Sequence, residues 1–309
     1  MPRHFLGQND LDAEEMLAIF ASATRLKQHK YSRDLQGQTL VMFFEKASTR
    51  TRLSFEIGMT QLGGHAVYLD RESSQLSRGE SVADTARVVS RYADLAMARV
   101  YQHRTLVDLA AHSTVPVING LSDEEHPCQS MTDAFSILES KGRIAGLRIA
   151  YVGDGQNNVT HSLMLAAAIL GAELQVAAPP SLQPERRYVD VATGLADLSG
   201  GSVDIGDDPR AAVEDADVVY TDVWVSMGRE DERQARLELL RPYQVNAELL
   251  TRAAPDYLFM HCLPAHAGEE VTGDVLYGDR SIVFEQAENR LHVQKALMLF
   301  LLDPNHGGK

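Results

Sequence analysis

Short apolar runs alternate with stretches of helical periodicity along the whole chain, and this alternation constrains the fold more than any other feature. The runs rich in strand formers in the first half are TLVMFF (39–44), HAVYLD (65–70), LAMARV (95–100) and VPVIN (115–119). Those in the second half are LRIAYVG (147–153), AELQVAA (172–178), SVDI (202–205), DVVYTDV (217–223), YLFMHCL (257–263) and SIVFE (281–285). The pattern is typical of mainly parallel sheets flanked by helices, so we expect an α/β fold with doubly wound domains.

The length of 309 residues favours two such domains over one. A first helix is expected to open at Asp10. A later predicted helix over 127–141, with proline in its first turn, is followed by two glycines, which places a domain junction at about residue 141. The expected domains are residues 1–141 and 142–286, with a last helix within 287–309 that packs back on the first domain.

Composition and charge disfavour several classes of function. The formal charge of −14 disfavours binding to nucleic acid or to anionic membranes. No apolar run is long enough for a membrane span and no apolar leader is visible, so we expect a cytoplasmic protein. The two cysteines, Cys128 and Cys262, match no zinc-ligand spacing, so neither a disulfide framework nor a structural metal site is indicated.

Ligands of open α/β sheets bind beyond the carboxyl ends of the strands, so the residues that follow each strand are the candidates for function. The first strand is followed by Ser48, Thr49, Arg50, Thr51 and Arg52 at a helix start. A helix N-terminus, hydroxyl donors and a guanidinium suit a phosphate. The alternative is a helix cap by Ser48 or Thr49 with the arginines on a solvated face. Arg50 and Arg52 point in different directions on a helix, and Arg50, nearer the turn, is the better anion ligand.

Later strand ends in the first half carry further polar side chains. Arg99 ends an otherwise apolar strand, where a charge is costly unless it is paired or binds a ligand. His126 and Gln129 lie around a helix start and could donate to a carbonyl oxygen on which negative charge builds up. The alternatives are an ion pair for Arg99 and a structural role for His126.

The first strand of the second half ends in GDGQNN, which resembles half of a dinucleotide fingerprint. Asn158 occupies the third glycine position of that fingerprint, and the next strand is not followed by a ribose-binding acid. The sequence therefore disfavours a nicotinamide cofactor. Asn157 and Asn158 instead place carboxamides at a helix start, where they could hold a carboxylate or an amino group.

The remaining candidates follow later strands. Asp222 and Ser226 suit an ammonium group, or alternatively a turn that stabilises the loop. Cys262 could be a nucleophile, a polar contact or a packing group, and nucleophilic catalysis is the least favoured because no hydrolase motif accompanies the thiol. Arg290 lies early in the last helix, where packing or an exposed ion pair is the alternative to ligand binding.

Four motifs together match a known family. S-T-R-T-R (48–52), H-P-C-Q (126–129), D-x-x-x-S-M-G (222–228) and H-C-L-P (261–264) occur in the order and separation seen in the aspartate/ornithine carbamoyltransferases. The chain most closely resembles the ornithine carbamoyltransferases. The likeness extends to ENRLHVQKAL near the C-terminus and covers essentially the whole chain.

The resemblance implies transfer of a carbamoyl group from carbamoyl phosphate to the side-chain amine of L-ornithine, without a metal or an organic cofactor. By motif position it assigns to carbamoyl phosphate Ser48, Thr49, Arg50, Thr51, Gln75, Arg99, His126, Gln129, Cys262, Leu263 and Arg290. It assigns to ornithine Asn158, Asp222, Ser226 and Met227. The catalytic residues implied are Arg50, Arg99, His126, Asp222 and Cys262. Either Asp222 with Cys262 or the departing phosphate could take the proton of the amine.

The resemblance also implies an active site in the cleft between two closing domains. It implies a homotrimer, possibly with further assembly of trimers, in which the Gln75 loop completes a neighbour's site. Ala267 departs from many relatives, which carry a basic residue there. The alternatives are transfer to putrescine, N-acetylornithine or aspartate, a non-catalytic binding protein of the same fold, and a dehydrogenase.

Replacing Arg50 by alanine should weaken carbamoyl phosphate binding and turnover far more than Arg52→Ala does, because only Arg50 is expected to face the phosphate. The KM for carbamoyl phosphate and kcat, measured side by side for the two variants, check this. Equal kinetic losses would remove the phosphate role from Arg50.

Overall fold

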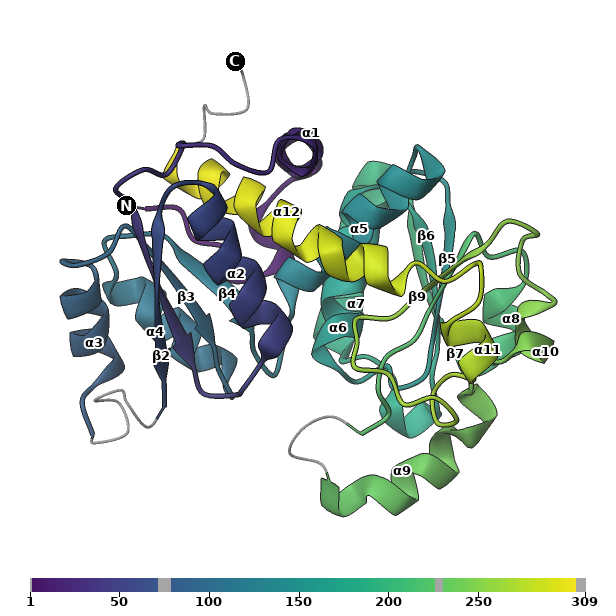
Figure 1. Cartoon of the computed structure of the whole chain (residues 1–309). Helices are drawn as coiled ribbons and strands as arrows, with labels where there is room; N and C mark the ends of the chain where they lie inside the picture. Colours follow the sequence, from purple (N-terminus) through teal and green to yellow (C-terminus); the bar gives the residue numbers. More distant parts are fainter. Residues whose placement is uncertain (1, 72–78, 226–229, 304–309) are drawn as a thin grey trace. The chain divides into compact units, whose positions relative to one another are not determined.

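A computed structural model describes residues 2–71, 79–225 and 230–303 of the chain. The chain divides into two compact units (Figure 1). One unit comprises Met1–Thr132 with Glu288–Lys309, and the other comprises Asp133–Ala287. Each contains a parallel sheet flanked by helices, which confirms the predicted α/β class. None of the described helices is long and apolar enough to cross a membrane.

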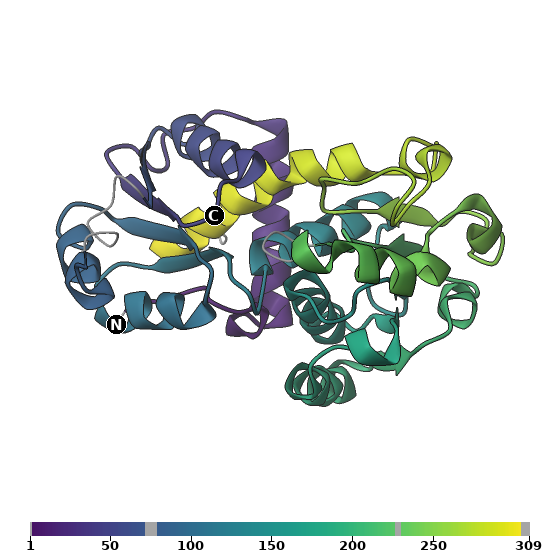
Figure 2. The ribbon, with the colours of Figure 1, turned by 90° about the horizontal axis from the view of Figure 1, so that it is seen from below.

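The first unit is built on a four-stranded parallel sheet in the order β2-β1-β3-β4. Its strands are β1 (Thr39–Phe44), β2 (His65–Asp70), β3 (Leu95–Arg99) and β4 (Val117–Leu121). Its helices are α1 (Ala13–Gln28), α2 (Thr49–Gln61), α3 (Val82–Val89) and α4 (His103–His112), together with most of α12 (Val283–Leu302) and the start of α5 (Pro127–Lys141). Figures 1 and 2 both show α12 running beside α2. Gly58 of α2 permits this approach, because a Cβ there would lie 3.2 Å from Lys295 Cγ.

The second unit is built on a five-stranded parallel sheet in the order β7-β6-β5-β8-β9. Its strands are β5 (Arg148–Val152), β6 (Glu173–Ala177), β7 (Ser202–Gly206), β8 (Val218–Tyr220) and β9 (Leu258–Met260). The helices after α5 are α6 (Asn158–Ile169), α7 (Arg186–Ser199), α8 (Pro209–Val213), α9 (Arg233–Leu240), α10 (Ala247–Leu250) and α11 (Gly273–Leu276). Helices α5, α6 and α7 cover one face of the sheet, and α8, α10 and α11 lie on the other (Figure 1). Val152, Val219 and Phe259 of its strands belong to one buried apolar cluster.

Strand register brings candidate residues to one edge within each unit. In the first unit Phe44 lies opposite both Asp70 and Arg99, so the loop after β1 begins beside Arg99. In the second unit Tyr220 of β8 lies opposite Met260 of β9. Asp222 and Cys262 each follow two residues later, so parallel pairing makes neighbours of two side chains that are distant in sequence.

The prediction of a strand at SIVFE (281–285) is wrong. Ser281 forms an isolated bridge with Phe259, and α12 then begins at Val283, one turn before the predicted start at residue 287. Val283 is 1% exposed whereas Phe284 is 62% exposed, so the run is the first turn of a helix that buries only part of its apolar surface. Short apolar runs do not distinguish a buried strand from a buried helical turn.

The prediction that the first helix opens at Asp10 is also wrong. Asp12 is the N-cap of α1, because its carboxylate accepts a hydrogen bond from Glu15 N (2.9 Å) while the Glu15 carboxylate accepts one from Asp12 N (3.1 Å). Asp10 instead accepts hydrogen bonds from the backbone of Leu6 and Gly7. An aspartate suits a helix N-cap and a preceding turn equally well. Only the reciprocal hydrogen bonds of the capping box identify Asp12 as the N-cap.

Candidate active site

The S-T-R-T-R block forms the start of α2. Ser48 is the N-cap, and its Oγ accepts a hydrogen bond from Thr51 N at 3.3 Å. The cap that sequence offered as the alternative to an anion site is therefore present, and the two are compatible because a capped helix N-terminus still carries partial positive charge. Arg52 has structural partners: its Nε donates to Glu56 Oε2 at 3.1 Å, and its guanidinium lies 4.0 Å from the Tyr68 ring centroid.

Arg290 of α12 joins three segments of the first unit. Its side chain is buried, with the residue 3% exposed. Nη1 donates to Gln129 Oε1 at 2.7 Å, and Nη2 donates to Thr51 Oγ1 at 3.3 Å. The structure thus brings together three residues that the sequence placed on separate helices, and the guanidinium fork fixes α12 against the starts of α2 and α5.

Arg99 ends β3 at an irregularity of the sheet. The pairing between β3 and β4 shifts register between Ala98 and Arg99, which is the kind of bulge that re-aims a side chain near functional sites. The residue is buried. Desolvation, and to a smaller extent the positive charge of Arg99, lower the pKa of Lys46, whose ammonium lies 4.7 Å from the Tyr101 ring centroid. Lys46 is therefore a further cation beside Arg99, to which the sequence assigned no role.

His126 lies at the point where these positive charges converge. The turn before it is closed by Ser122 N donating to Glu125 O at 2.9 Å and by Glu125 N donating to Ser122 Oγ at 3.2 Å. Burial lowers the pKa of His126 well below its ordinary value, and the charges of Arg290, Arg99 and Arg50 lower it further. The imidazole is therefore neutral at pH 7, so one ring nitrogen can donate a hydrogen bond without a net charge. The first unit brings His126 together with Arg50, Arg99 and Arg290.

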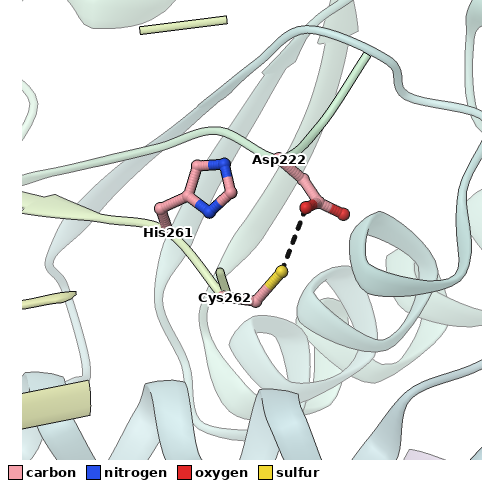
Figure 3. Close-up of side chains that lie close together, drawn as sticks. All are labelled: Asp222, His261 and Cys262. Atoms are coloured by element: carbon pink, nitrogen blue, oxygen red, sulfur yellow. Dashed lines mark hydrogen bonds between the residues drawn. The ribbon is translucent and has the colours of Figure 1, made fainter. Parts of the chain in front are cut away.

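The second unit brings Asp222 and Cys262 together at the edge of its sheet (Figure 3). The Cys262 thiol donates to Asp222 Oδ1 at 3.0 Å, and Val223 N donates to the same oxygen at 2.8 Å. Asp222 is 6% exposed. Cys128 differs, because burial raises the pKa of its thiol to about 12 and it donates to the carbonyl of Asn119. Cys128 is thus an inert core thiol, whereas Cys262 lies against a carboxylate.

His261 supports the backbone next to Cys262, and the sequence assigned it no role. Its Nδ1 accepts a hydrogen bond from Leu263 N at 2.8 Å, which assigns the ring proton to Nε2, 3.3 Å from Glu270 Oε1. Leu263 has a left-handed backbone, with φ of +58°. Such a conformation costs about 1–3 kcal/mol for a residue other than glycine and is retained mostly at functional sites. The histidine of H-C-L-P could have been singled out from sequence, but Glu270 carried no such signal.

Asn158 is the first residue of α6 and is partly buried. The preceding Asn157 is the N-cap: its Oδ1 accepts from Thr160 N at 2.9 Å and its Nδ2 donates to Tyr151 Oη at 2.9 Å. Both carboxamides therefore lie at the helix start, as predicted, and the Asn157 side chain caps the helix.

Three predicted site residues, Gln75, Ser226 and Met227, lie outside the described residues. Ala267 is exposed and forms an isolated bridge with Val271. Among the described residues, two groups have ligand atoms within 4.8 Å of one another: Asp222, His261 and Cys262, and also His266, Glu269 and Glu270. In the first group the Cys262 thiol donates to Asp222 and His261 Nδ1 accepts from Leu263, so these atoms already have protein partners.

Comparison with known proteins identifies the family. The model described as the carbamoyl-P binding domain of aspartate/ornithine carbamoyltransferase matches residues 3–139, and that described as the Asp/Orn binding domain matches residues 145–301. The chain belongs to the aspartate/ornithine carbamoyltransferase family.

Relatives in this carbamoyltransferase family align over nearly the whole chain. The anabolic ornithine carbamoyltransferase of Pyrococcus furiosus is 53% identical over 304 residues, covering 97% of this chain and 96% of the relative. The ornithine carbamoyltransferase of Bacillus subtilis is 50% identical over 307 residues, covering 99% of this chain and 96% of the relative. A solved structure of the Pyrococcus furiosus enzyme superposes with a TM-score of 0.93 at 53% identity, covering 96% of each chain.

The depressed pKa of His126 predicts a pH dependence of stability. Below the ordinary histidine pKa of about 6.5 the unfolded chain takes up a proton that the folded chain refuses, so stability is lost as pH falls. The free energy of unfolding of the wild type should therefore fall more steeply below pH 6.5 than that of His126→Asn, by up to about 1.4 kcal/mol per pH unit. Urea denaturation of both proteins from pH 5 to pH 8 checks this, and parallel profiles would contradict it.

Proposed function

We propose that this carbamoyltransferase transfers the carbamoyl group of carbamoyl phosphate to the side-chain amine of L-ornithine, giving L-citrulline and phosphate in arginine biosynthesis. The observation that carries the proposal is identity of 50% or more, over nearly the whole chain, to relatives named ornithine carbamoyltransferase. The geometry of each unit supplies a part of the chemistry that this reaction needs.

The cations of the first unit, Arg50, Arg99 and Arg290, are proposed to stabilise the phosphate as it leaves. The amine attacks the carbamoyl carbon, a C–N bond forms, and the bond from that carbon to the phosphate oxygen breaks, so negative charge moves onto the leaving group. Cations fixed at the leaving group stabilise this charge. The residues proposed to hold phosphate are Ser48, Thr49, Arg50, Thr51, Gln75, Arg99 and Arg290.

His126 and Gln129 are proposed to hold the carbamoyl oxygen. Attack on the carbamoyl carbon makes a tetrahedral oxyanion, and each well-placed donor to such an oxygen is typically worth about 3 kcal/mol of barrier. A neutral imidazole suits this task, and the depressed pKa of His126 keeps it neutral. Arg290 donates to the Gln129 carboxamide oxygen and so orients the side chain, and the Gln129 NH₂ is the proposed donor to the carbamoyl oxygen.

The Asp222–Cys262 pair is proposed to receive the ornithine side-chain amine. That amine must lose a proton before it can attack, and a carboxylate hydrogen-bonded to a thiol provides a relay for it. The departing phosphate is the alternative acceptor. Asn158, Ser226 and Met227 are proposed to bind the amino acid end of ornithine together with Asp222, and the Leu263 backbone is proposed to contact the carbamoyl group. The reaction needs no metal or organic cofactor.

Residues 1–141 with the last helix are proposed to bind carbamoyl phosphate, and residues 142–286 are proposed to bind ornithine. We further propose a cytoplasmic homotrimer in which Gln75 serves a neighbouring site, with further assembly of trimers as an option. Exposed apolar side chains on α2 support association of subunits, with Leu53 48% and Ile57 42% exposed. Apolar residues on one exposed helix face commonly mark an interface.

An acceptor panel tests the substrate assignment. Purified protein with carbamoyl phosphate should release phosphate and form a carbamoylated product with L-ornithine, and should do so far more slowly with putrescine, N-acetylornithine or aspartate. Asp222 is expected to bind the amino acid end of ornithine, so Asp222→Asn should raise the KM for ornithine. Preference for putrescine would overturn the substrate, and carbamoyl phosphate binding without turnover would indicate a non-catalytic binding protein.

A further inference from the structure

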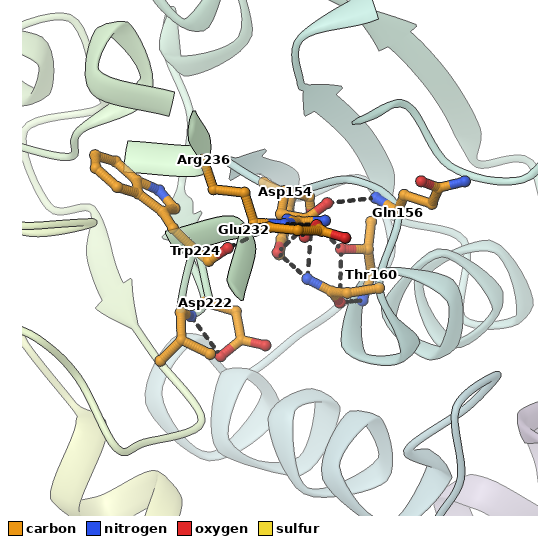
Figure 4. A network of polar contacts seen from close by, with 10 residues as sticks. Asp154, Gln156, Thr160, Asp222, Trp224, Glu232 and Arg236 are labelled. Atoms are coloured by element: carbon orange, nitrogen blue, oxygen red, sulfur yellow. Dashed lines mark hydrogen bonds and ion pairs between the residues drawn. The ribbon is translucent and has the colours of Figure 1, made fainter. Parts of the chain in front are cut away.

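A buried ion pair lies near Asp222 in the second unit (Figure 4). Arg236 of α9 is 4% exposed and Asp154, two residues beyond β5, is 1% exposed. Arg236 Nη1 donates to Asp154 Oδ2 at 2.7 Å and to the carbonyl of Trp224 at 3.2 Å, while Nε donates to Glu232 Oε2 at 2.9 Å. The sequence assigned no role to either member of the pair.

Asp154 connects this pair to the start of α6. Its carbonyl accepts hydrogen bonds from Tyr151 Oη (2.9 Å), Asn157 Nδ2 (2.8 Å) and Thr160 Oγ1 (3.2 Å). Asn157 caps α6 and directly precedes Asn158. The Asp154 backbone therefore holds the helix start while its carboxylate binds the guanidinium.

Arg236 also reaches the segment that carries Asp222. Its hydrogen bond to the Trp224 carbonyl fixes a point two residues after Asp222, in a part of the chain without regular secondary structure. Arg236 is thus a single buried group in contact with both segments that contain ornithine candidates: the α6 start through Asp154, and the stretch after β8 through Trp224.

The ion pair of Arg236 with Asp154 also affects the charge near Asp222. Burial raises the pKa of the Tyr151 phenol most, and the negative charges of Asp222 and Asp154 raise it further, so the two carboxylates lie around one group. Arg236 forms its ion pair with Asp154, the carboxylate to which the sequence assigned no ligand role. The guanidinium neutralises Asp154 and leaves Asp222 as the carboxylate that attracts a cationic amino acid. A buried carboxylate that loses its partner is strongly destabilised and would compete for such a cation.

We propose that Arg236 is a positioning residue for the amino acid substrate: through Asp154 and Trp224 it fixes the α6 start and the Asp222 segment in the orientation that binds ornithine. This inference rests on the proposed function. Ion pairs of this kind contribute little net stability compared with apolar residues of similar size, so a role in orientation accounts for a buried charge better than stability does.

The test compares three variants by steady-state kinetics. Arg236→Leu removes the charge and both hydrogen-bonding nitrogens, and should raise the KM for ornithine by about tenfold to a hundredfold, the range that misplacement of a substrate group by about 1 Å produces. Arg236→Lys keeps the charge and should recover part of this loss. Arg233→Leu is the matched control, because Arg233 is on the same helix but its side chain is 48% exposed and pairs with Glu269; its KM for ornithine should stay within about twofold of the wild type.

Calorimetric titration of carbamoyl phosphate without ornithine separates positioning from general damage. The proposal expects its dissociation constant to change less than about twofold in Arg236→Leu. Equal weakening of both substrates, or an unchanged KM for ornithine in folded protein, would overturn the proposal. If thermal unfolding shows that Arg236→Leu is not folded, the KM for ornithine of Arg236→Lys and Asp154→Asn tests the proposal instead. Loss of the fold in all three variants would assign the pair a purely structural role and overturn the proposal. A wild type that forms no citrulline would refute the proposed function instead.

Discussion

The bridge from Arg290 to Thr51 and Gln129 is the contact on which the candidate site of the first unit depends. It joins α12 to α2 and α5, helices that are remote in sequence, and it brings a buried guanidinium close to His126. Several positive charges in one partly buried place repel one another, and an anion relieves that repulsion. The formal charge of the chain is −14. A concentration of cations at one place in such a protein suits an anionic ligand, and carbamoyl phosphate provides one.

The second unit uses a different physical device. Parallel pairing of β8 with β9 places Asp222 beside Cys262, and a left-handed Leu263 held by His261 sets the backbone that follows. The arrangement is made of a carboxylate, a thiol and backbone groups, which suits an ammonium or amine rather than a phosphate. The buried guanidinium of Arg236 pairs with Asp154, and in the proposed role this leaves the charge of Asp222 available to a cation.

Much of this architecture could be predicted from sequence because its causes are local. The strands are apolar runs bounded by polar residues, and polar side chains after a parallel strand fall at the ligand-binding edge, so their position in the sequence is enough to single out Arg99, Asp222 and Cys262. The motifs S-T-R-T-R and H-P-C-Q indicate the family. Capping details were less predictable, since Asp10 and Asp12 differ only in which backbone groups they contact.

The contacts that depend on distant partners could not be predicted. Arg236 stands in a polar helix four residues after Glu232, a pattern that indicates a surface pair, and only the fold reveals Asp154 beneath it. Glu270 lies beyond the H-C-L-P motif, and only the fold shows that its carboxylate lies next to His261 Nε2. The start of α12 at Val283 was missed because a short apolar run fits a strand as well as the first turn of a helix.

The central claim is that the buried arginines of the first unit bind the phosphate of carbamoyl phosphate. Titration calorimetry of carbamoyl phosphate against wild type and Arg290→Gln, without ornithine, tests it most directly. Arg252→Gln is the control, because that side chain is 45% exposed and pairs with Glu214 in the second unit. Loss of a charge-assisted hydrogen bond worth about 1.5–3 kcal/mol should weaken binding by about tenfold to a hundredfold in Arg290→Gln and leave the control unchanged. Wild-type affinity in a folded Arg290→Gln protein would contradict the account.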